Sequence, residues 1–142
     1  MNSCKIVSVT KENIHLLIGF IDQLGTASET FRYFNKRPVT VINSHLTTLL
    51  LLHNNLPIAY GHLEKENEIV WLGICVLPGN AGKGFGKLMM HRLIEKAKEN
   101  NLLSINLTVD KMNIPAINLY GQFKFSKVDE TASSYKYLLL LH

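Results

Sequence analysis

The chain has 142 residues, of which 46% are hydrophobic and 18% charged, and its formal net charge is +4. This length predicts a single domain over residues 1–142, and the composition lacks the bias of a disordered chain. The basic residues are scattered rather than gathered in a stripe. That distribution argues against a nucleic-acid partner and suits an anionic small molecule.

Two cysteines, Cys4 and Cys75, cannot build a disulfide framework, so we expect a reducing, cytoplasmic compartment. The leucine runs at 49–52 and 138–141 are too short to cross a bilayer, and residues 1–10 lack the apolar region of a secretory signal. We therefore expect no membrane partner, and we expect no metal.

The hydrophobic spacing predicts the elements of the first half in chain order. A strand over 5–10 precedes a helix that ends near Gly25, and the aromatic segment 31–34 lies in a second helix that stops at Pro38. Three strands follow over 46–53, 57–64 and 69–77, joined by tight turns. They form an antiparallel meander whose last strand is apolar enough to be central.

The second half changes to a helical pattern. An amphipathic helix covers 83–100, with its apolar face made by Phe85, Leu88, Met89, Leu93 and Ala97. A strand over 103–109, a helix over 114–123 and strands over 124–129 and 135–141 complete the chain. The strands 69–77 and 103–109 are then parallel neighbours in a β-α-β unit. The predicted class is α/β, a mixed sheet with helices on its faces, in the order β-α-α-β-β-β-α-β-α-β-β.

The most informative segment is the turn Gly82-Lys83-Gly84-Phe85-Gly86, between a buried strand and the start of the long helix. Unpaired N–H groups at a helix start, together with glycines that let a ligand approach, predict a phosphate or pyrophosphate site. A P-loop would need Ser or Thr after Gly-Lys, but Gly84 and Leu88 follow the two Gly-Lys pairs. The Gly-x-Gly-x-x-Gly dinucleotide fingerprint also fails, because the frames from Gly82 and Gly84 meet Lys87 and Met89.

The pattern that fits is Gly-x-Gly-x-Gly after a strand ending in Val-x-Pro, and it resembles the acetyl-CoA-binding motif of the GCN5-related N-acetyltransferase (GNAT) family. That family's pattern is Gln/Arg-x-x-Gly-x-Gly/Ala. Ala81 stands where the Gln or Arg usually is, so the backbone carries the match rather than a side chain. The family's second block is matched by residues 113–123, and the resemblance covers roughly 46–128. It implies a single-domain GNAT-like fold and an acetyl-CoA-dependent N-acetyltransferase.

The resemblance also implies where the cofactor binds. The backbone from Gly82 to Lys87 would hold the pyrophosphate, and Ile74 and Val76 would pair with the pantetheine arm, with the Val76 N–H as oxyanion donor. Asn113 would cap the following helix, contact the cofactor, or both. The predicted cofactor-binding residues are Ile74, Val76, Ala81, Gly82, Lys83, Gly84, Phe85, Gly86, Lys87 and Asn113.

Catalysis by direct attack needs an acid for the leaving thiolate and a base for the amine. The resemblance implies Tyr120 as the acid. In the histone-modifying branch of the family a glutamate is the base, but Val70 occupies that position here. We place His62 first, because its unperturbed pKa suits the task, ahead of Glu64 and Glu68. A water chain to a more distant residue is the remaining alternative.

The acceptor is the least determined part. Residues 31–34, Phe-Arg-Tyr-Phe, and the Lys36-Arg37 pair predict a cationic, aromatic wall, with Arg32 or Arg37 on a phosphate or carboxylate. The segment loosely resembles acetyltransferases of bacterial surface-sugar synthesis, which modify nucleotide-linked amino sugars. A small-molecule primary amine is therefore the first interpretation, a peptide or protein amine is the second, and a non-catalytic acetyl-CoA-binding module is the third. The oligomeric state stays open, with a homodimer as one option.

Overall fold

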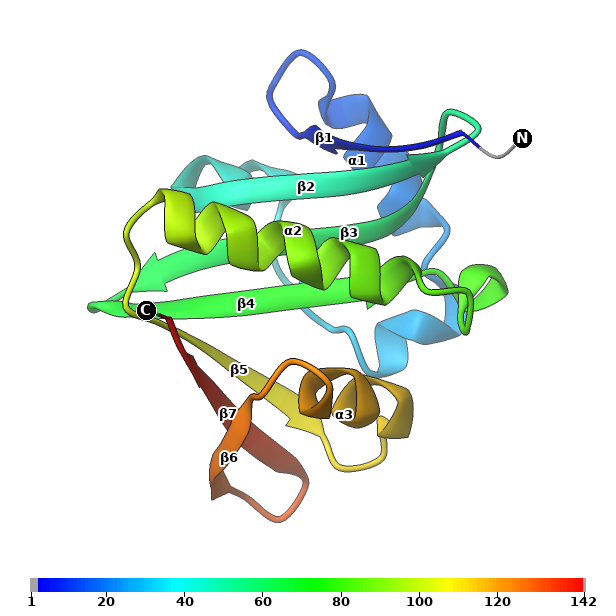
Figure 1. Cartoon of the computed structure of the whole chain (residues 1–142). Coiled ribbons are helices and arrows are strands. Elements are labelled where there is room, and N and C mark those ends of the chain that lie inside the picture. Colours follow the sequence, from blue (N-terminus) through cyan, green and yellow to red (C-terminus); the bar gives the residue numbers. More distant parts are fainter. Residues whose placement is uncertain (1–2, 142) are drawn as a thin grey trace.

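A seven-stranded mixed sheet, ordered β1-β2-β3-β4-β5-β7-β6, runs through the chain, which the computed structural model describes over residues 3–141 (Figure 1). Neighbouring strands are antiparallel except for β4 and β5. The strands are β1 (Cys4–Ser8), β2 (His45–His53), β3 (Leu56–Glu66), β4 (Ile69–Val76), β5 (Ser104–Asp110), β6 (Ser126–Glu130) and β7 (Ser134–Leu140). The helices are α1 (Ile14–Asp22), α2 (Phe85–Glu99) and α3 (Ile114–Gly121), with short 3-10 helices η1 (Gly25–Glu29), η2 (Val39–Ser44) and η3 (Pro78–Asn80). The predicted mixed fold is confirmed.

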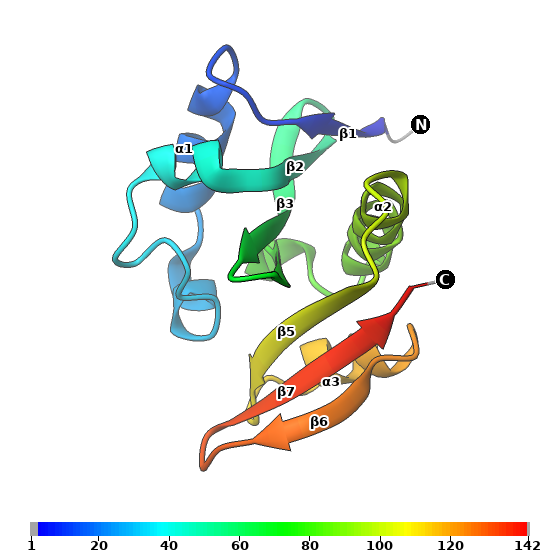
Figure 2. The ribbon, with the colours of Figure 1, turned by 90° about the vertical axis from the view of Figure 1, so that its left-hand side faces the viewer.

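The two faces of the sheet carry separate hydrophobic clusters. Figure 2 shows α1 and α2 on opposite sides of β2 and β3. Alternate residues of β2 supply both clusters, because successive side chains of a strand point to opposite faces: Leu50 packs with the α1 cluster and Leu51 with the α2 cluster. Gly61 on β3 lets α2 lie close, because a Cβ there would come within 2.7 Å of Leu93 Cδ1.

The predicted second helix over the aromatic segment is wrong. Residues 31–37 form turns between η1 and η2. A helix would turn positions 31 and 33 about 200° apart, yet their two rings stack on each other at 6.4 Å. Phe31 and Phe34 also both reach the Tyr60 ring, at 5.5 and 5.4 Å. Packing around this buried tyrosine therefore overrides the helical pattern.

Helix α2 is shorter than predicted, and one residue of its apolar face was assigned wrongly. It begins at Phe85, after Gly84 at the N-cap, and ends at Glu99. Leu88 is 49% exposed, while Met90 is fully buried. The buried face of α2 therefore contains Met90 in place of Leu88, while the other four predicted residues are buried as expected.

The central strands β4 and β5 are parallel neighbours, as predicted, but they separate along their length. Their pairing is recorded at Trp71 and Asn106, near the start of β4, and the strands then diverge toward their carboxyl ends (Figure 1). The second half of β4 consequently leaves its backbone free on the β5 side. Two adjoining cavities, one near the end of β4 and one between β4 and β5, open at this divergence.

Candidate active site

The glycine-rich turn has a backbone that only glycine adopts easily. Gly82 and Gly84 have φ values of +75° and +85°, in the left-handed region where a Cβ costs about 1–2 kcal/mol. The first helical bond of α2 runs from Leu88 N to Gly84 O at 3.1 Å. The N–H groups of residues 85–87 therefore have no partner within the helix and point toward an approaching anion.

A cavity of about 590 Å³ lies over this turn, between the end of β4 and the start of α3. It is lined by every predicted cofactor residue except Lys83, namely Ile74, Val76, Ala81, Gly82, Gly84, Phe85, Gly86, Lys87 and Asn113. A further wall comes from Thr26, Ala27, Thr30 and Phe31. The sequence indicated Phe31 as part of an aromatic wall but gave no signal for Thr26, Ala27 and Thr30.

The backbone of β4 turns its free groups toward the same cavity. Leu77 N donates to Ile58 O on β3 at 2.9 Å. Because backbone groups alternate in direction along a strand, those of Ile74 and Val76 point the other way, to the side from which β5 diverges. An extended arm laid along β4 could pair with them as an added strand does.

A second cavity of about 390 Å³ adjoins the first, and both are lined by Thr30, Phe31, Ile74 and Asn113. The second cavity contains the predicted catalytic and acceptor residues Tyr120, His62, Arg32 and Arg37, together with Glu64. The fold thus brings the two predicted groups of residues to adjoining cavities that meet beside Ile74.

Tyr120 lies on α3 and is 5% exposed. Its ring packs against Phe125 and Tyr137, with centroids at 5.8 and 6.1 Å. Burial raises the pKa of Tyr120 well above its usual value, so the phenol is protonated at neutral pH. Asn113 caps the same helix by accepting from Ala116 N at 3.4 Å, as predicted for a cap.

His62 lies on β3 and is 3% exposed. Its Nδ1 is 2.6 Å from the Tyr60 hydroxyl, and within residues 3–141 its Nε2 has no hydrogen-bond partner. The ring lies over Gly73 of β4, where any Cβ would collide with it. Burial, with smaller contributions from His45 and Arg37, lowers the pKa of His62 well below 6.5. The imidazole is therefore neutral at pH 7 and carries a lone pair.

A polar network surrounds His62. The Tyr33 hydroxyl donates to Glu64 Oε1 at 2.9 Å and lies 2.6 Å from His45 Nε2. Ser44 Oγ donates to the other carboxylate oxygen of Glu64 at 3.3 Å. Burial raises the pKa of Tyr33 and lowers that of His45. The sequence placed Tyr33 in the aromatic wall but did not indicate His45 or its contact with Tyr33, because the two meet only through the pairing of β2 with β3 and the turn before η2.

Glu68, the third candidate base, lies apart from this network. It occupies the turn after β3 with φ +70°, its side chain is 90% exposed, and it pairs with Lys65 at 3.6 Å. It lines neither cavity. Glu68 therefore lies in the turn between β3 and β4, away from His62 and Glu64.

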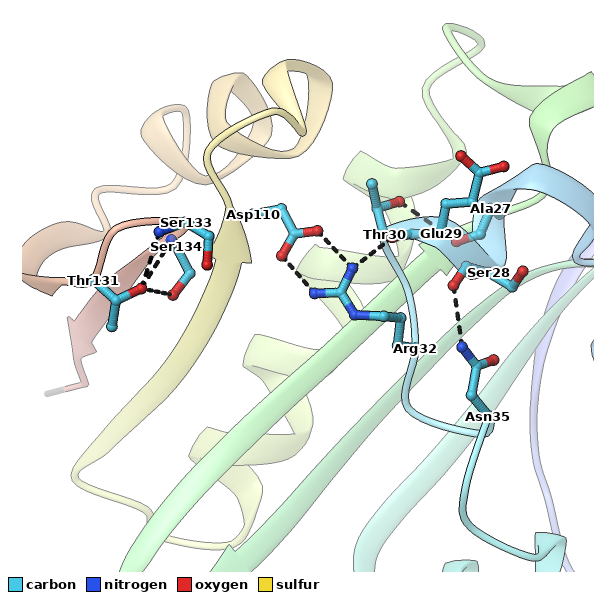
Figure 3. A network of polar contacts seen from close by, with 10 residues as sticks. All are labelled: Ala27, Ser28, Glu29, Thr30, Arg32, Asn35, Asp110, Thr131, Ser133 and Ser134. Atoms are coloured by element: carbon cyan, nitrogen blue, oxygen red, sulfur yellow. Dashed lines mark hydrogen bonds and ion pairs between the residues drawn. The ribbon is translucent and has the colours of Figure 1, made fainter.

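The two candidate acceptor arginines are already engaged, and Figure 3 shows the contact of Arg32 with Asp110. Arg32 forms two hydrogen bonds of 2.8 Å with the Asp110 carboxylate, which joins the 31–37 segment to the end of β5. Arg37 donates to Tyr33 O at 2.9 Å, and its guanidinium lies 4.4 Å from the centre of the Tyr33 ring. Arg32 is thus a bridge at the cavity rim rather than a free cation.

The buried neutral histidine predicts a loss of stability in acid. An unfolded histidine takes up a proton as the pH falls below about 6.5, whereas folded His62 does so only at its much lower pKa. Its contribution is therefore complete above about pH 6.5 and is lost below it, at up to about 1.4 kcal/mol per pH unit. We expect urea unfolding between about pH 7.5 and pH 5.5 to show a shallower loss for His62→Gln than for the unaltered chain. His15→Gln, at an exposed position of α1, is the control, and equal slopes for all three proteins would contradict the expectation.

None of the helices in the part of the chain that the structure describes is both long and apolar enough to cross a membrane.

Comparison with known proteins places the chain in a family. Residues 17–125 match the model of the acetyltransferase (GNAT) family. The [Ribosomal protein bS18]-alanine N-acetyltransferase of Haemophilus influenzae is 34% identical over 82 residues, which are 57% of this chain and 56% of that protein. The chain therefore spans about half the length of the curated relative it matches.

Solved structures share the fold at low identity. The PaiA N-acetyltransferase of Thermoplasma acidophilum, in complex with coenzyme A, has a TM-score of 0.78 and 15% identity, covering 98% of this chain and 99% of that one. The spermidine N-acetyltransferase of Vibrio cholerae, in complex with CoA and spermine, has a TM-score of 0.78 and 15% identity, covering 96% and 95%. Because the family match spans most of the chain, including the glycine-rich turn, the chain belongs to the acetyltransferase (GNAT) family.

Proposed function

We propose that this protein transfers the acetyl group of acetyl-CoA to the primary amine of a small molecule by direct attack. The observation that carries the proposal is the meeting of the two cavities at Ile74 and Asn113. The larger one has the anion-binding turn and the free edge of β4, and the smaller one has a buried phenol and a buried neutral imidazole. A thioester held at the junction would face both groups.

The steps follow from the two side chains. His62 takes a proton from the acceptor ammonium, and the amine nitrogen attacks the thioester carbonyl carbon. The Val76 N–H stabilises the oxyanion of the tetrahedral intermediate. The carbon–sulfur bond then breaks, and the thiolate takes the phenolic proton of Tyr120. The attacking nitrogen loses its second proton, which returns through solvent to the Tyr120 phenolate and leaves the neutral amide. Burial keeps the imidazole neutral and the phenol protonated at pH 7, which are the forms in which the two steps begin.

The charges of the smaller cavity support a cationic acceptor. Glu64, Glu66 and Asp110 line it beside Arg32 and Arg37. Since Asp110 is neutralised by Arg32, two carboxylates, those of Glu64 and Glu66, remain against the one guanidinium of Arg37, and this balance still favours an ammonium. A nucleotide-linked amino sugar has less support than the sequence indicated, because the Arg32 guanidinium is bound by Asp110.

A second candidate acceptor is the amine of a peptide or protein. The relative from Haemophilus influenzae favours it, because its name assigns it an alanine of a ribosomal protein. The spermidine enzyme that shares the fold gives the small-molecule alternative a concrete test compound.

The cellular compartment is a separate part of the proposal. The free cysteines, Cys4 exposed and Cys75 buried, support the expected reducing, cytoplasmic location.

The deciding experiment is an acceptor screen with acetyl-CoA, in which free thiol release is followed over polyamines, amino sugars, aminoglycosides and peptides beginning with alanine. Release with a small amine, at a rate well above that with any peptide, is the expected result. Preference for a peptide would establish the second candidate. Coenzyme A binding without release for any acceptor would instead identify a non-catalytic module.

Arg32→Ala tests the acceptor wall. Loss of the Asp110 bridge frees the 31–37 segment, so we expect the KM for the acceptor to rise roughly twofold to fivefold, with unchanged acetyl-CoA affinity. Arg92→Ala is the matched control, because its ion pairs with Glu95 and Glu99 lie on α2 outside both cavities. Steady-state kinetics at saturating acetyl-CoA give the comparison, and an unaltered KM in Arg32→Ala would remove the wall from acceptor binding.

A further inference from the structure

We propose that His45, His62 and Glu64 form a binding site for a divalent transition-metal ion of the zinc type, in the wall of the smaller cavity. One possible ligand atom from each residue lies within 4.8 Å of the other two. His62 and Glu64 share a face of β3, being two residues apart, and His45 on β2 pairs with Glu64. Two imidazoles and a carboxylate, with a further position open to water, form a donor set that zinc takes in proteins.

The two imidazoles are held in the way that metal-binding histidines are. His45 Nδ1 is 2.8 Å from Thr48 Oγ1, and His62 Nδ1 is 2.6 Å from the Tyr60 hydroxyl. A hydrogen bond at one ring nitrogen orients a histidine so that the other nitrogen can bind a metal. In both histidines Nε2 is therefore the nitrogen that would bind the metal. The two rings are stacked, with their centroids 4.4 Å apart.

The Tyr33 hydroxyl marks the space that the ion would take. It contacts His45 Nε2 and Glu64 Oε1 at 2.6 and 2.9 Å, so it already lies between two of the three donors. Zinc bonds of about 2.0–2.2 Å put tetrahedral ligand atoms roughly 3.4 Å apart, so the donors need to close by about 1.4 Å at most. Side-chain rotation and displacement of the phenol, which belongs to the 31–37 turns rather than to the sheet, supply that movement.

Metal binding would affect acetyl transfer, and this consequence alone rests on the proposed function. The ion would occupy the lone pair with which His62 accepts the amine proton. Inhibition by Zn²⁺ should therefore be relieved by a chelator and should weaken as the acceptor concentration rises, with no effect on acetyl-CoA binding.

The test is a titration of the full chain, freed of metal by a chelator, with Co²⁺ as the probe. Tetrahedral Co²⁺ with nitrogen and oxygen ligands absorbs visibly, so we expect absorption that saturates at one ion per chain. His45→Ala and Glu64→Gln should each weaken the binding at least about tenfold. Tyr33→Phe keeps the three donors and the ring and should keep the absorption. His91→Ala, at an exposed position of α2, should bind as the unaltered chain does.

Circular dichroism would show whether each variant is folded. If His45→Ala does not fold, the conservative Glu64→Gln still tests the site. Absence of saturable absorption in the unaltered chain would overturn the site, as would unchanged binding in the folded donor variants. The readout requires no acceptor and no turnover. A negative acetylation screen would therefore leave the metal site intact, and a negative titration would leave the proposed function intact.

Discussion

Tyr120→Phe should lower kcat at saturating acetyl-CoA about a hundredfold, the smaller end of what a positioned acid contributes. The substitution removes one hydroxyl from a ring that packs against Phe125 and Tyr137, so the packing of α3 should be retained. Without the phenolic proton the thiolate leaves unprotonated, which slows collapse of the tetrahedral intermediate. Because Tyr120 lines the smaller cavity and not the larger, coenzyme A should bind as before.

The measurement combines steady-state kinetics with calorimetric titration of coenzyme A. Tyr137→Phe is the matched control. It also removes a hydroxyl from a ring beside Tyr120, but Tyr137 lines neither cavity. A kcat for Tyr120→Phe equal to that of the control would exclude the tyrosine as the acid. A parallel loss of coenzyme A affinity would instead assign it to the shape of the cofactor cavity.

Gly84→Val should raise the dissociation constant for coenzyme A at least about tenfold, which corresponds to about 1.4 kcal/mol. Gly84 is the N-cap of α2 with φ +85°, and a β-branched residue is a conformational outlier there. The free turn can relax to a negative φ, but it must return to the strained form for its N–H groups to converge on the pyrophosphate. Affinity is therefore lost even if the helix stays intact.

Gly79→Val separates this effect from a general sensitivity of the loop. Gly79 lies in η3 a few residues earlier, its φ is not positive, and a Cβ there would have open space. Calorimetry with coenzyme A alone needs no acceptor, so the comparison can be made before the acceptor is known. Equal dissociation constants for the two variants would show that the turn does not bind the pyrophosphate through its backbone.

The cofactor half of the site was predictable from the sequence because it is local. A strand end, a glycine-rich turn and a helix start follow one another between Ile74 and Lys87, and backbone geometry over such a short segment depends on the residues themselves. The same holds for Asn113, which caps the helix that begins beside it. Family membership rested on this segment, and the match over residues 17–125 confirms it.

The acceptor half was less predictable because it is built from contacts between distant residues. Arg32 meets Asp110 across 78 positions, and Tyr33 meets Glu64 across 31. Because of the first contact, the Arg32 guanidinium is bound to Asp110 instead of being available to an anionic acceptor. The second contact places Tyr33 beside Glu64, close to His45 and His62. The 31–37 segment was predicted as a helix, but the packing of its aromatic rings around Tyr60 gives it a turn conformation instead.

By itself, the sequence determined the antiparallel meander of β2, β3 and β4, the glycine-rich turn and the parallel β4–β5 pair, because periodicity, glycine positions and connection lengths are local properties. Only the tertiary structure decided that β4 and β5 separate after Trp71 and that two cavities meet there. It also decided which polar side chains are buried against one another, because burial and long-range pairing depend on the whole sheet. The candidate cofactor site could therefore be inferred from one segment, whereas the candidate acceptor site forms only when the strands and the 31–37 turns come together.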